Sequence, residues 1–213
     1  MTTGDRLIIL HTTKFSETSI VVHTLSREYG RRSFLVRKPR MSMFLPLNIV
    51  EAEIVESSKS KLFLARNFSS EFPLNGIRNN IYKNSITLFL SEMLFKTLKD
   101  GAREDKFFEW CESRILLLDA LESDFSNFHL RFLLEMAVQL GFAPERRDLM
   151  PFVGEHCELV TQLLESQFPE SMMVPMSGAV RNEIADLLVR YIEYHSESAI
   201  NINSLRVLRE LFI

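Results

Sequence analysis

The hydrophobic pattern of this chain changes its period near residue 70, and this change limits the folds open to it. Before that point apolar and polar residues alternate in short runs, as they do in β-strands. After Gly76 the apolar residues recur at helical spacing. The segment Phe68–Gly76 separates the two patterns, and its Pro73 interrupts any regular element. We therefore expect two domains, residues 1–72 and residues 77–213.

The first domain is expected to contain five short strands. They are Leu7–Thr13, Ser19–Ser26, Arg31–Arg37, Leu47–Glu56 and Lys61–Asn67. In the third strand Phe34 and Val36 share the inner face, so Arg31 and Arg37 project outward. Five strands in about 60 residues, without a helix among them, indicate a small closed barrel. The OB-fold is the commonest five-stranded form, and an SH3-like barrel is the alternative.

The second domain is expected to be all helical. Its candidate helices are Asn80–Leu98, Phe107–Leu121, Asn127–Leu140, Glu155–Gln167, Asn182–His195 and Ser204–Phe212. Ser126 or Asn127 can cap the third helix, and Gly141 stands where a C-terminal glycine belongs. The fold class is therefore a two-domain α+β chain, with a five-stranded OB-fold β-barrel followed by an all-α helical bundle.

Basic residues concentrate in the first domain. Residues 1–80 hold 12 Lys/Arg against 7 Asp/Glu, whereas residues 81–213 hold 13 against 21, so the total of −3 hides an asymmetry. We expect the barrel cations to converge on one surface and bind nucleic acid. Scattered surface charge is the alternative. The predicted DNA contacts are Lys14, Arg27, Arg31, Arg32, Arg37, Lys38, Arg40, Lys59 and Lys61.

Aromatic residues in expected loops could stack against bases. Phe15, Tyr29 and Phe44 occupy such positions, whereas Phe34 and Phe63 fall inside strands and are expected in the core.

No motif for catalysis or metal binding is present. The chain lacks the GxSxG, HExxH, phosphate-loop and GxGxxG patterns. His129 lies on an apolar helix, where a lone histidine is usually packed, and the adjacent His156 and Cys157 point to different sides of a helix. We expect no catalytic residue, no metal, no cofactor and no small-molecule substrate.

The two cysteines indicate a reducing compartment. Cys111 and Cys157 are far apart and form no CxxC pair, which fits free thiols and a cytoplasmic protein. Asp5 and Arg6 interrupt any signal-peptide pattern. The longest apolar runs, such as Ile86–Leu90, are too short to span a bilayer, so no membrane contact is expected.

The expected helix Asn127–Leu140 offers a second candidate site. It is apolar nearly all round, and Arg131 is its only cation. An arginine beside an apolar groove suits a peptide that ends in an aromatic residue and a free carboxylate. The alternative is an intramolecular pair between Arg131 and Glu135 at i, i+4 spacing.

Three stretches of the chain resemble a known family. LHTTKFSETSIVVHTLSREYGRRSFLVRK resembles the opening of bacterial RecO proteins, in which an aromatic-x-Glu-x-Ser loop precedes an apolar strand and a Thr/Ser-x-Glu-x-Gly turn. The matching positions here are Phe15, Glu17, Ser19, Ser26, Glu28, Gly30, Arg31 and Arg37. NFHLRFLLEMAVQLGFAP resembles the second-domain helix, and SLRVLRELF the C-terminus, of the form without zinc cysteines found in Bacteroidetes.

The resemblance implies a recombination mediator that acts at the nucleoid and is not an enzyme. Such a protein binds single- and double-stranded DNA, anneals complementary strands and helps RecA replace the single-strand-binding protein SSB. RecR is the implied partner, and the SSB C-terminal tail is expected to dock in the helical domain at a position that Arg131 matches. An adaptor whose barrel binds an acidic protein, without DNA, is the alternative.

Two departures from the family pattern concern its binding sites. Many members carry a four-cysteine zinc motif, but here the corresponding region, Pro144–Val160, holds only Cys157, so no metal is carried over. The loop RKPRMSMFLPL after the third strand is shorter than usual, and Leu45 replaces the family's Gln before the proline.

Overall fold

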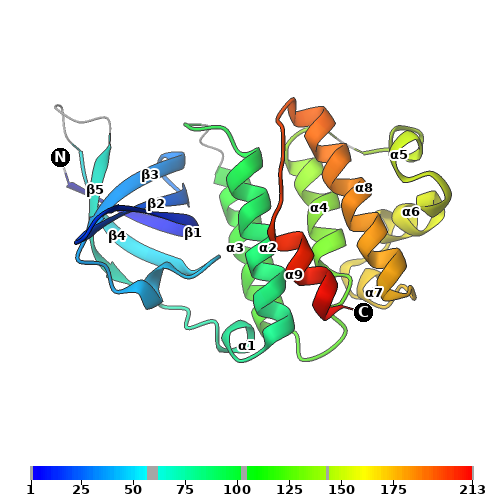
Figure 1. The fold of residues 1–213 in the computed structure, drawn as a ribbon, viewed down its shortest axis with the longest axis horizontal. Coiled ribbons are helices and arrows are strands. Elements are labelled where there is room, and N and C mark those ends of the chain that lie inside the picture. The colour runs from blue at the N-terminus through cyan, green and yellow to red at the C-terminus, as the bar shows by residue number, and fades with distance from the viewer. Residues whose placement is uncertain (1, 57–61, 102–104, 143, 213) are drawn as a thin grey trace. The chain divides into compact units, whose positions relative to one another are not determined.

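The protein, described by a computed structural model over residues 2–56, 62–101, 105–142 and 144–212, divides into two compact units (Figure 1). One comprises Met1–Asn75 and Ser91–Leu117, and the other comprises Gly76–Leu90 and Leu118–Ile213. The units therefore do not follow the expected boundary at residues 72–77. The barrel does end there along the chain, but its unit also takes in parts of two helices, α2 (Ile81–Thr97) and α3 (Asp105–Ala120).

The first unit is built on a closed five-stranded barrel. Its strands are β1 (Thr2–Ser16), β2 (Ser19–Ser26), β3 (Gly30–Arg37), β4 (Ile49–Val55) and β5 (Phe63–Ser69). They follow the order β1-β2-β3-β5-β4, in which β3 and β5 pair in parallel and the other neighbours are antiparallel. This barrel fits the OB-fold predicted from the alternating pattern.

Inward-facing apolar residues fill the barrel as the alternation predicts. Phe34 and Val36 of β3 point into the core opposite Val22 and Ile20 of β2. Phe44, in the 3-10 helix η1 (Met41–Phe44), packs into the same core, and its ring lies 4.9 Å from that of Phe68.

One outer face of the barrel is buried as well. Leu7–Leu10 of β1 are four consecutive buried residues, but only Leu7 and Ile9 belong to the barrel interior. On the outer face the rings of His11 and Phe95 lie 4.9 Å apart, and the backbone N–H of Gly101 donates to Arg31 O at 2.9 Å. The Ser91–Leu117 segment of the same unit therefore covers this face.

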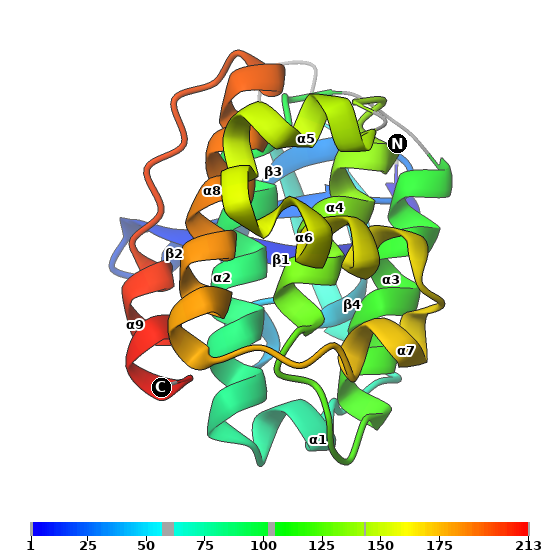
Figure 2. The same ribbon diagram turned by 90° about the vertical axis from the view of Figure 1, so that its right-hand side faces the viewer.

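The second unit is helical throughout the part that the structure describes. Besides portions of α2 and α3 it contains α1 (Asn75–Arg78), α4 (Phe128–Gln139), α5 (Arg146–Val153), η2 (Gly154–His156), α6 (Cys157–Glu165), α7 (Phe168–Met172), α8 (Gly178–Ser196) and α9 (Ser204–Leu211). The buried helix α4 contacts α6, α7 and α8 (Figure 2). No helix within the described ranges is long and apolar enough to cross a membrane.

The helices differ in detail from the expected ones because tertiary contacts also determine where they begin and end. Asn127 occupies the N-cap position of α4, but its side chain makes no capping bond and donates instead to the carbonyls of Ser171, Met172 and Val174. Gly141 follows α4 with a φ of 83°, as expected of a C-terminal glycine. The segment Arg146–Val153, which is not among the expected helices, forms α5.

Candidate nucleic-acid interface

Four of the predicted contact residues gather at one end of the barrel. The β1–β2 hairpin meets the end of β3 there: Ser19 pairs with Arg37, and the backbone N–H of Lys38 donates to Thr18 O at 2.7 Å. Lys14 lies on the same hairpin, opposite Ile20. We call the group Lys14, Arg37, Lys38 and Arg40 the basic tip.

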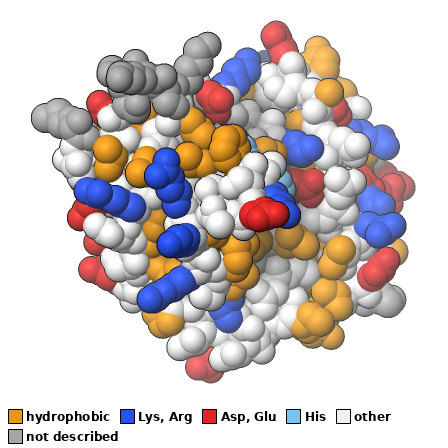
Figure 3. Space-filling view, turned by 60° about the vertical axis from the view of Figure 1, so that its left-hand side comes forward, with side chains coloured by type: hydrophobic (Ala, Val, Ile, Leu, Met, Phe, Trp, Pro, Cys, Tyr) orange, Lys and Arg blue, Asp and Glu red, His pale blue; other side chains and the backbone are white. Residues whose placement is uncertain are grey.

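The basic tip is open to solvent. All four side chains are exposed, and none forms an ion pair with another residue that the structure describes. Two exposed apolar side chains directly follow basic-tip residues in the sequence, Phe15 at 63% and Met41 at 53% exposure. Figure 3 shows Lys and Arg side chains interspersed with hydrophobic ones on the barrel side of the molecule. This combination matches what a nucleotide chain offers, phosphates and stackable bases.

The backbone at Lys38 is unusual for a side-chain-bearing residue. Its φ is 47°, in the left-handed region that few residues other than glycine and asparagine adopt. The hydrogen bond to Thr18 O holds the turn in this form, and the turn brings Lys38 to the hairpin.

Two other predicted contacts lie elsewhere. Arg27 and Arg32 are near the opposite end of the strands, and Arg32 is roughly 17 Å from Arg37 along β3. Arg27 pairs with Glu109 at 3.2 Å, and the guanidinium of Arg32 lies over the Phe63 ring at 4.4 Å. The expectation that all the cations converge on one surface is therefore wrong for this pair. Lys59 and Lys61 lie outside the described residues.

Arg31 is on the outer face of β3, as expected, but it is not exposed. It retains 6% of its accessible surface, and its guanidinium lies 4.8 Å from the centre of the Phe95 ring. Its Nη1 is 3.6 Å from Oδ1 of Asp100, and burial lowers the pKa of the guanidinium. The expectation of a solvent-facing Arg31 is wrong, because strand alternation does not reveal that a helix covers this face.

Two of the three aromatic candidates for stacking also belong to packed regions. Phe44 is in the core, and Tyr29 is partly buried, with its ring 6.2 Å from Phe34 and 5.9 Å from Phe63. The Tyr29 hydroxyl donates to Glu56 at 2.8 Å. Phe15 remains as the exposed aromatic side chain among the three.

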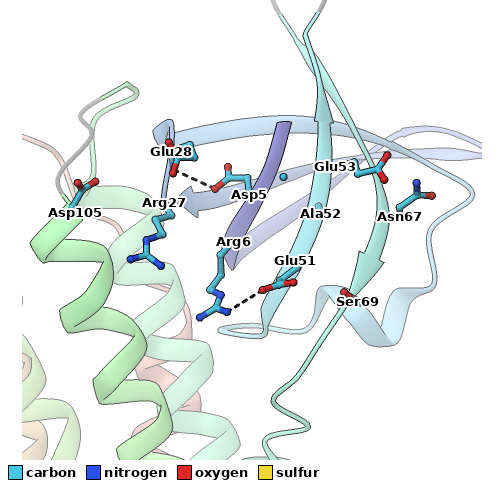
Figure 4. A pocket seen from close by; sticks show the side chains of 11 residues that line it. Asp5, Arg6, Arg27, Glu28, Glu51, Ala52, Glu53, Asn67, Ser69 and Asp105 are labelled. Atoms are coloured by element: carbon cyan, nitrogen blue, oxygen red, sulfur yellow. Dashed lines mark hydrogen bonds and ion pairs between the residues drawn. The ribbon is translucent and has the colours of Figure 1, made fainter. Parts of the chain in front are cut away.

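Sequence reasoning missed a pocket of about 630 Å³ whose lining includes five acidic residues and two arginines (Figure 4). Five of its lining residues carry carboxylates: Asp5, Glu28, Glu51, Glu53 and Asp105. Arg6 lies among them and pairs with Glu51 at 2.9 Å and with Glu112 at 3.1 Å. Arg27 lines the pocket as well, but the five carboxylates outnumber the two arginines, so the pocket does not attract a polyanion as the basic tip does.

Asp5 in this pocket has a local structural role. Its carboxylate accepts hydrogen bonds from the Ser26 hydroxyl at 2.5 Å and from the backbone N–H of Glu28 at 3.2 Å. Burial raises the pKa of the Asp5 carboxyl, whereas these two hydrogen bonds act to lower it. The contacts fix the tight turn between β2 and β3.

A histidine pair lies on the covered outer face of the barrel. The ring of His23 is within 3.0 Å of the Thr13 hydroxyl and 2.8 Å of the Ser33 hydroxyl, and it packs against Phe95. Burial, and then the positive charge of Arg31, lower the pKa of His23 to about 4. Burial likewise lowers the pKa of His11, so both rings are neutral at pH 7.

In the helical unit Arg131 already has partners. Its Nε donates to Oε1 of Glu135 at 2.8 Å, which is the intramolecular pair considered above, and its Nη1 donates to the carbonyls of Leu163 and Leu164. These carbonyls belong to the last turn of α6, which leaves them without partners inside the helix. An apolar pocket of about 430 Å³ is formed by residues of α6, α7 and the segment after α7, but Arg131 does not line it.

The cysteines offer no activated nucleophile. Cys111 and Cys157 are both buried free thiols. Burial raises the pKa of Cys111 well above its usual value, so this thiol stays protonated and unreactive.

Comparisons with known proteins give one family. The family models described as "Recombination protein O N terminal" and "Recombination protein O C terminal" match residues 1–66 and 78–148. A protein of Phocaeicola vulgatus named "DNA repair protein RecO" is 30% identical, over 96% of this chain and 97% of its own length. Proteins of the same name from Flavobacterium johnsoniae and Bacteroides fragilis are 28% and 27% identical, over 97% and 96% of this chain and 98% and 97% of their own lengths.

Proposed function

The chain belongs to the RecO family of DNA repair proteins, and we propose that it serves repair and recombination by binding single- and double-stranded DNA at the basic tip. The observation that carries this proposal is the set of four exposed cations without ion-pair partners among the described residues. They belong to the β1–β2 hairpin and to the adjoining end of β3 with the residues after it, so a single phosphate backbone can reach several of them.

The proposed mechanism is electrostatic. Lys14, Arg37, Lys38 and Arg40 would neutralise phosphates and release counterions. Phe15 would provide a stacking surface for a base, a contact worth about 1–3 kcal/mol. A neutralised strand repels its complement less, so binding promotes annealing. No bond is made or broken in this mechanism, and it needs no catalytic residue.

Arg27 and Arg32 would form a secondary contact for the same or a second strand. Lys59 and Lys61, which lie outside the described residues, are proposed as further DNA contacts. Arg27 is 44% exposed in its side chain and can exchange Glu109 for a phosphate. Arg32 presents one side of its guanidinium to Phe63, which leaves the other side for a base. Arg31 is excluded from this footprint because it is buried.

The experiment replaces Arg37, Lys38 and Arg40 together by glutamate and follows annealing and binding of labelled oligonucleotides. The matched control makes the same charge change on the helical unit, at the exposed Arg147, Arg190 and Arg206. With four phosphate contacts, the log of the wild-type affinity for a single strand should fall against log salt with a slope of about −3. The tip variant should lose most of this slope, and the control should keep it.

Two results contradict the proposal. If both triple variants weaken binding equally, net charge and not the tip is responsible. If the wild type shows no salt-dependent binding of either DNA form, the barrel does not bind DNA, and an adaptor for an acidic protein becomes the better account.

The implied partners extend this proposal to a cytoplasmic, nucleoid-associated mediator. We suggest that RecR joins the complex to load RecA, and that the SSB tail binds beside Arg131. The described contacts of Arg131 use Nε and Nη1, which leaves Nη2 for the terminal carboxylate of the tail. Fluorescence anisotropy with a tail peptide tests this, because Arg131→Lys retains the charge but loses the forked geometry; equal affinity in this variant would contradict the role of Arg131.

A further inference from the structure

Three side chains with metal-binding chemistry meet in the helical unit. Glu155 and His156 come from η2, and Glu183 comes from the second turn of α8. One ligand atom from each lies within 4.8 Å of the other two. Sequence reasoning set His156 aside because its neighbour Cys157 points elsewhere, and it could not foresee that the fold brings Glu183 to this histidine.

His156 provides a second, independent observation. The residue is 9% exposed, and its buried Nε2 makes no hydrogen bond with any residue that the structure describes. It nevertheless lies 3.1 Å from Oε2 of Glu183, so it points at the carboxylate without the alignment of a hydrogen bond. Buried ring nitrogens ordinarily have a partner, and an imidazole beside two carboxylates suits a shared cation.

We infer that Glu155, His156 and Glu183 bind a divalent transition-metal ion of the zinc type. Zinc holds imidazole nitrogen at about 2.0–2.1 Å and carboxylate oxygen at about 2.0–2.2 Å, so two tetrahedral ligand atoms lie roughly 3.3 Å apart. The separation of 3.1 Å between His156 Nε2 and Glu183 Oε2 already fits this value. Glu155 is exposed and can rotate inward by the remaining distance.

The ligand types select the kind of ion. An imidazole nitrogen disfavours magnesium and calcium, which prefer oxygen ligands, and favours zinc and its transition-metal neighbours. Three protein ligands leave one tetrahedral position for water. The bound ion would join η2, and with it the start of α6, to α8.

This site differs from the four-cysteine zinc motif that many family members carry. Cys157 lies in the corresponding region, but its buried Sγ contacts Arg146 O at 3.8 Å and the Thr161 hydroxyl at 4.0 Å. The inferred ligands are a histidine and two carboxylates from segments far apart in the sequence. The inference is independent of DNA binding, so either can fail without the other.

Calorimetric titration of the untagged full-length protein with zinc chloride, together with thermal unfolding, tests the inference. We expect one ion to bind per chain. At a free zinc concentration near one hundred times Kd, the melting temperature should rise by about 5–10 °C. Magnesium chloride at the same concentration should cause no comparable rise.

Variants locate the ion. His156→Asn and Glu183→Gln should each weaken zinc binding at least about tenfold. The matched controls are His195→Asn, a partly buried histidine on α8, and Glu158→Gln, an exposed glutamate on α6, and both should bind zinc as the wild type does. Glu183 is 57% exposed in its side chain, so its substitution preserves the fold even if His156→Asn does not.

Two outcomes would overturn the inference. One is the absence of zinc binding by the wild type. The other is an unchanged affinity in Glu183→Gln, which would place the ion elsewhere.

Discussion

At the scale of single residues, His23 on the covered outer face of the barrel makes the stability of the fold sensitive to acid. His23 is partly buried and lies near Arg31, and burial first, then the positive charge of Arg31, disfavour its protonated form. In the unfolded chain the same ring titrates near pH 6.5.

We predict that the stability of the barrel unit falls between pH 6.5 and about pH 4. Above this window His23 is neutral in both states, so it adds no pH dependence. Within the window the unfolded chain binds a proton that the folded ring refuses until about pH 4, and this lowers the free energy of unfolding. Urea unfolding of wild type and His23→Gln at pH 7.5 and pH 4.5 measures the effect.

The variant should lose less stability on acidification than the wild type. The comparison is a difference between two proteins, so the titration of other groups, such as the fully buried His129 with a pKa of about 3, cancels. Equal losses in both proteins would show that His23 does not contribute.

At the scale of secondary-structure elements, the sequence predicts the strands better than the helices. Period-2 alternation placed Phe34 and Val36 inside, and this is confirmed. Alternation reports only which face a residue occupies. Whether that face is open depends on distant segments, which is why Arg31 was misjudged.

The missed helices are short and depend on their surroundings. α5 contains Pro151, and α7 spans only five residues and begins next to Pro169, so neither carries a helical periodicity that can be read from the sequence. The expected start of α8 at Asn182 was late because Ser177 caps the helix by accepting a hydrogen bond from Val180 N.

The candidate site, like the fold, was predictable from the sequence only in part. The residues of the basic tip follow from charge and strand ends, whereas the ligands proposed for zinc lie too far apart in the sequence for any spacing rule.

An element-scale prediction concerns the end of α6. Arg131→Leu removes the donors to two terminal carbonyls and the cation beside Glu135, whose side chain is 12% exposed. We expect a loss of about 3 kcal/mol in the free energy of unfolding, because a buried carboxylate loses its cation. The double variant Arg131→Leu/Glu135→Leu should lose only about 1 kcal/mol, since both charges are then gone.

Urea unfolding of Arg131→Leu, Glu135→Leu and the double variant completes a double-mutant cycle. If the two single losses simply add in the double variant, the residues are not coupled and α6 is held by other contacts.

At the scale of the whole molecule, the barrel is not a separable module. Ile8, Leu10 and Leu25 are buried although they lie outside the barrel interior, and Ser91–Leu117 belongs to the same compact unit. A fragment of residues 1–75 would expose these apolar side chains.

We predict that this fragment self-associates, which size-exclusion chromatography detects. Leu10→Thr/Leu25→Thr should make the fragment more soluble yet lower the melting temperature of the full-length chain, because the same positions are exposed in one and packed in the other. A monomeric fragment that melts as the full chain does would contradict the division into units.

The opposite charges on the barrel have a consequence for how quickly and in what pose a ligand arrives. The basic tip is at the β1–β2 hairpin, whereas the pocket in which five carboxylates outnumber two arginines includes Asp5 and Glu28 near the other ends of these strands. This separation gives the barrel an electric dipole, which exerts a torque on an incoming polyanion over about one Debye length. Productive encounters therefore begin at the basic tip. Lowering the salt concentration should raise the association rate by a larger factor than it lowers the dissociation rate.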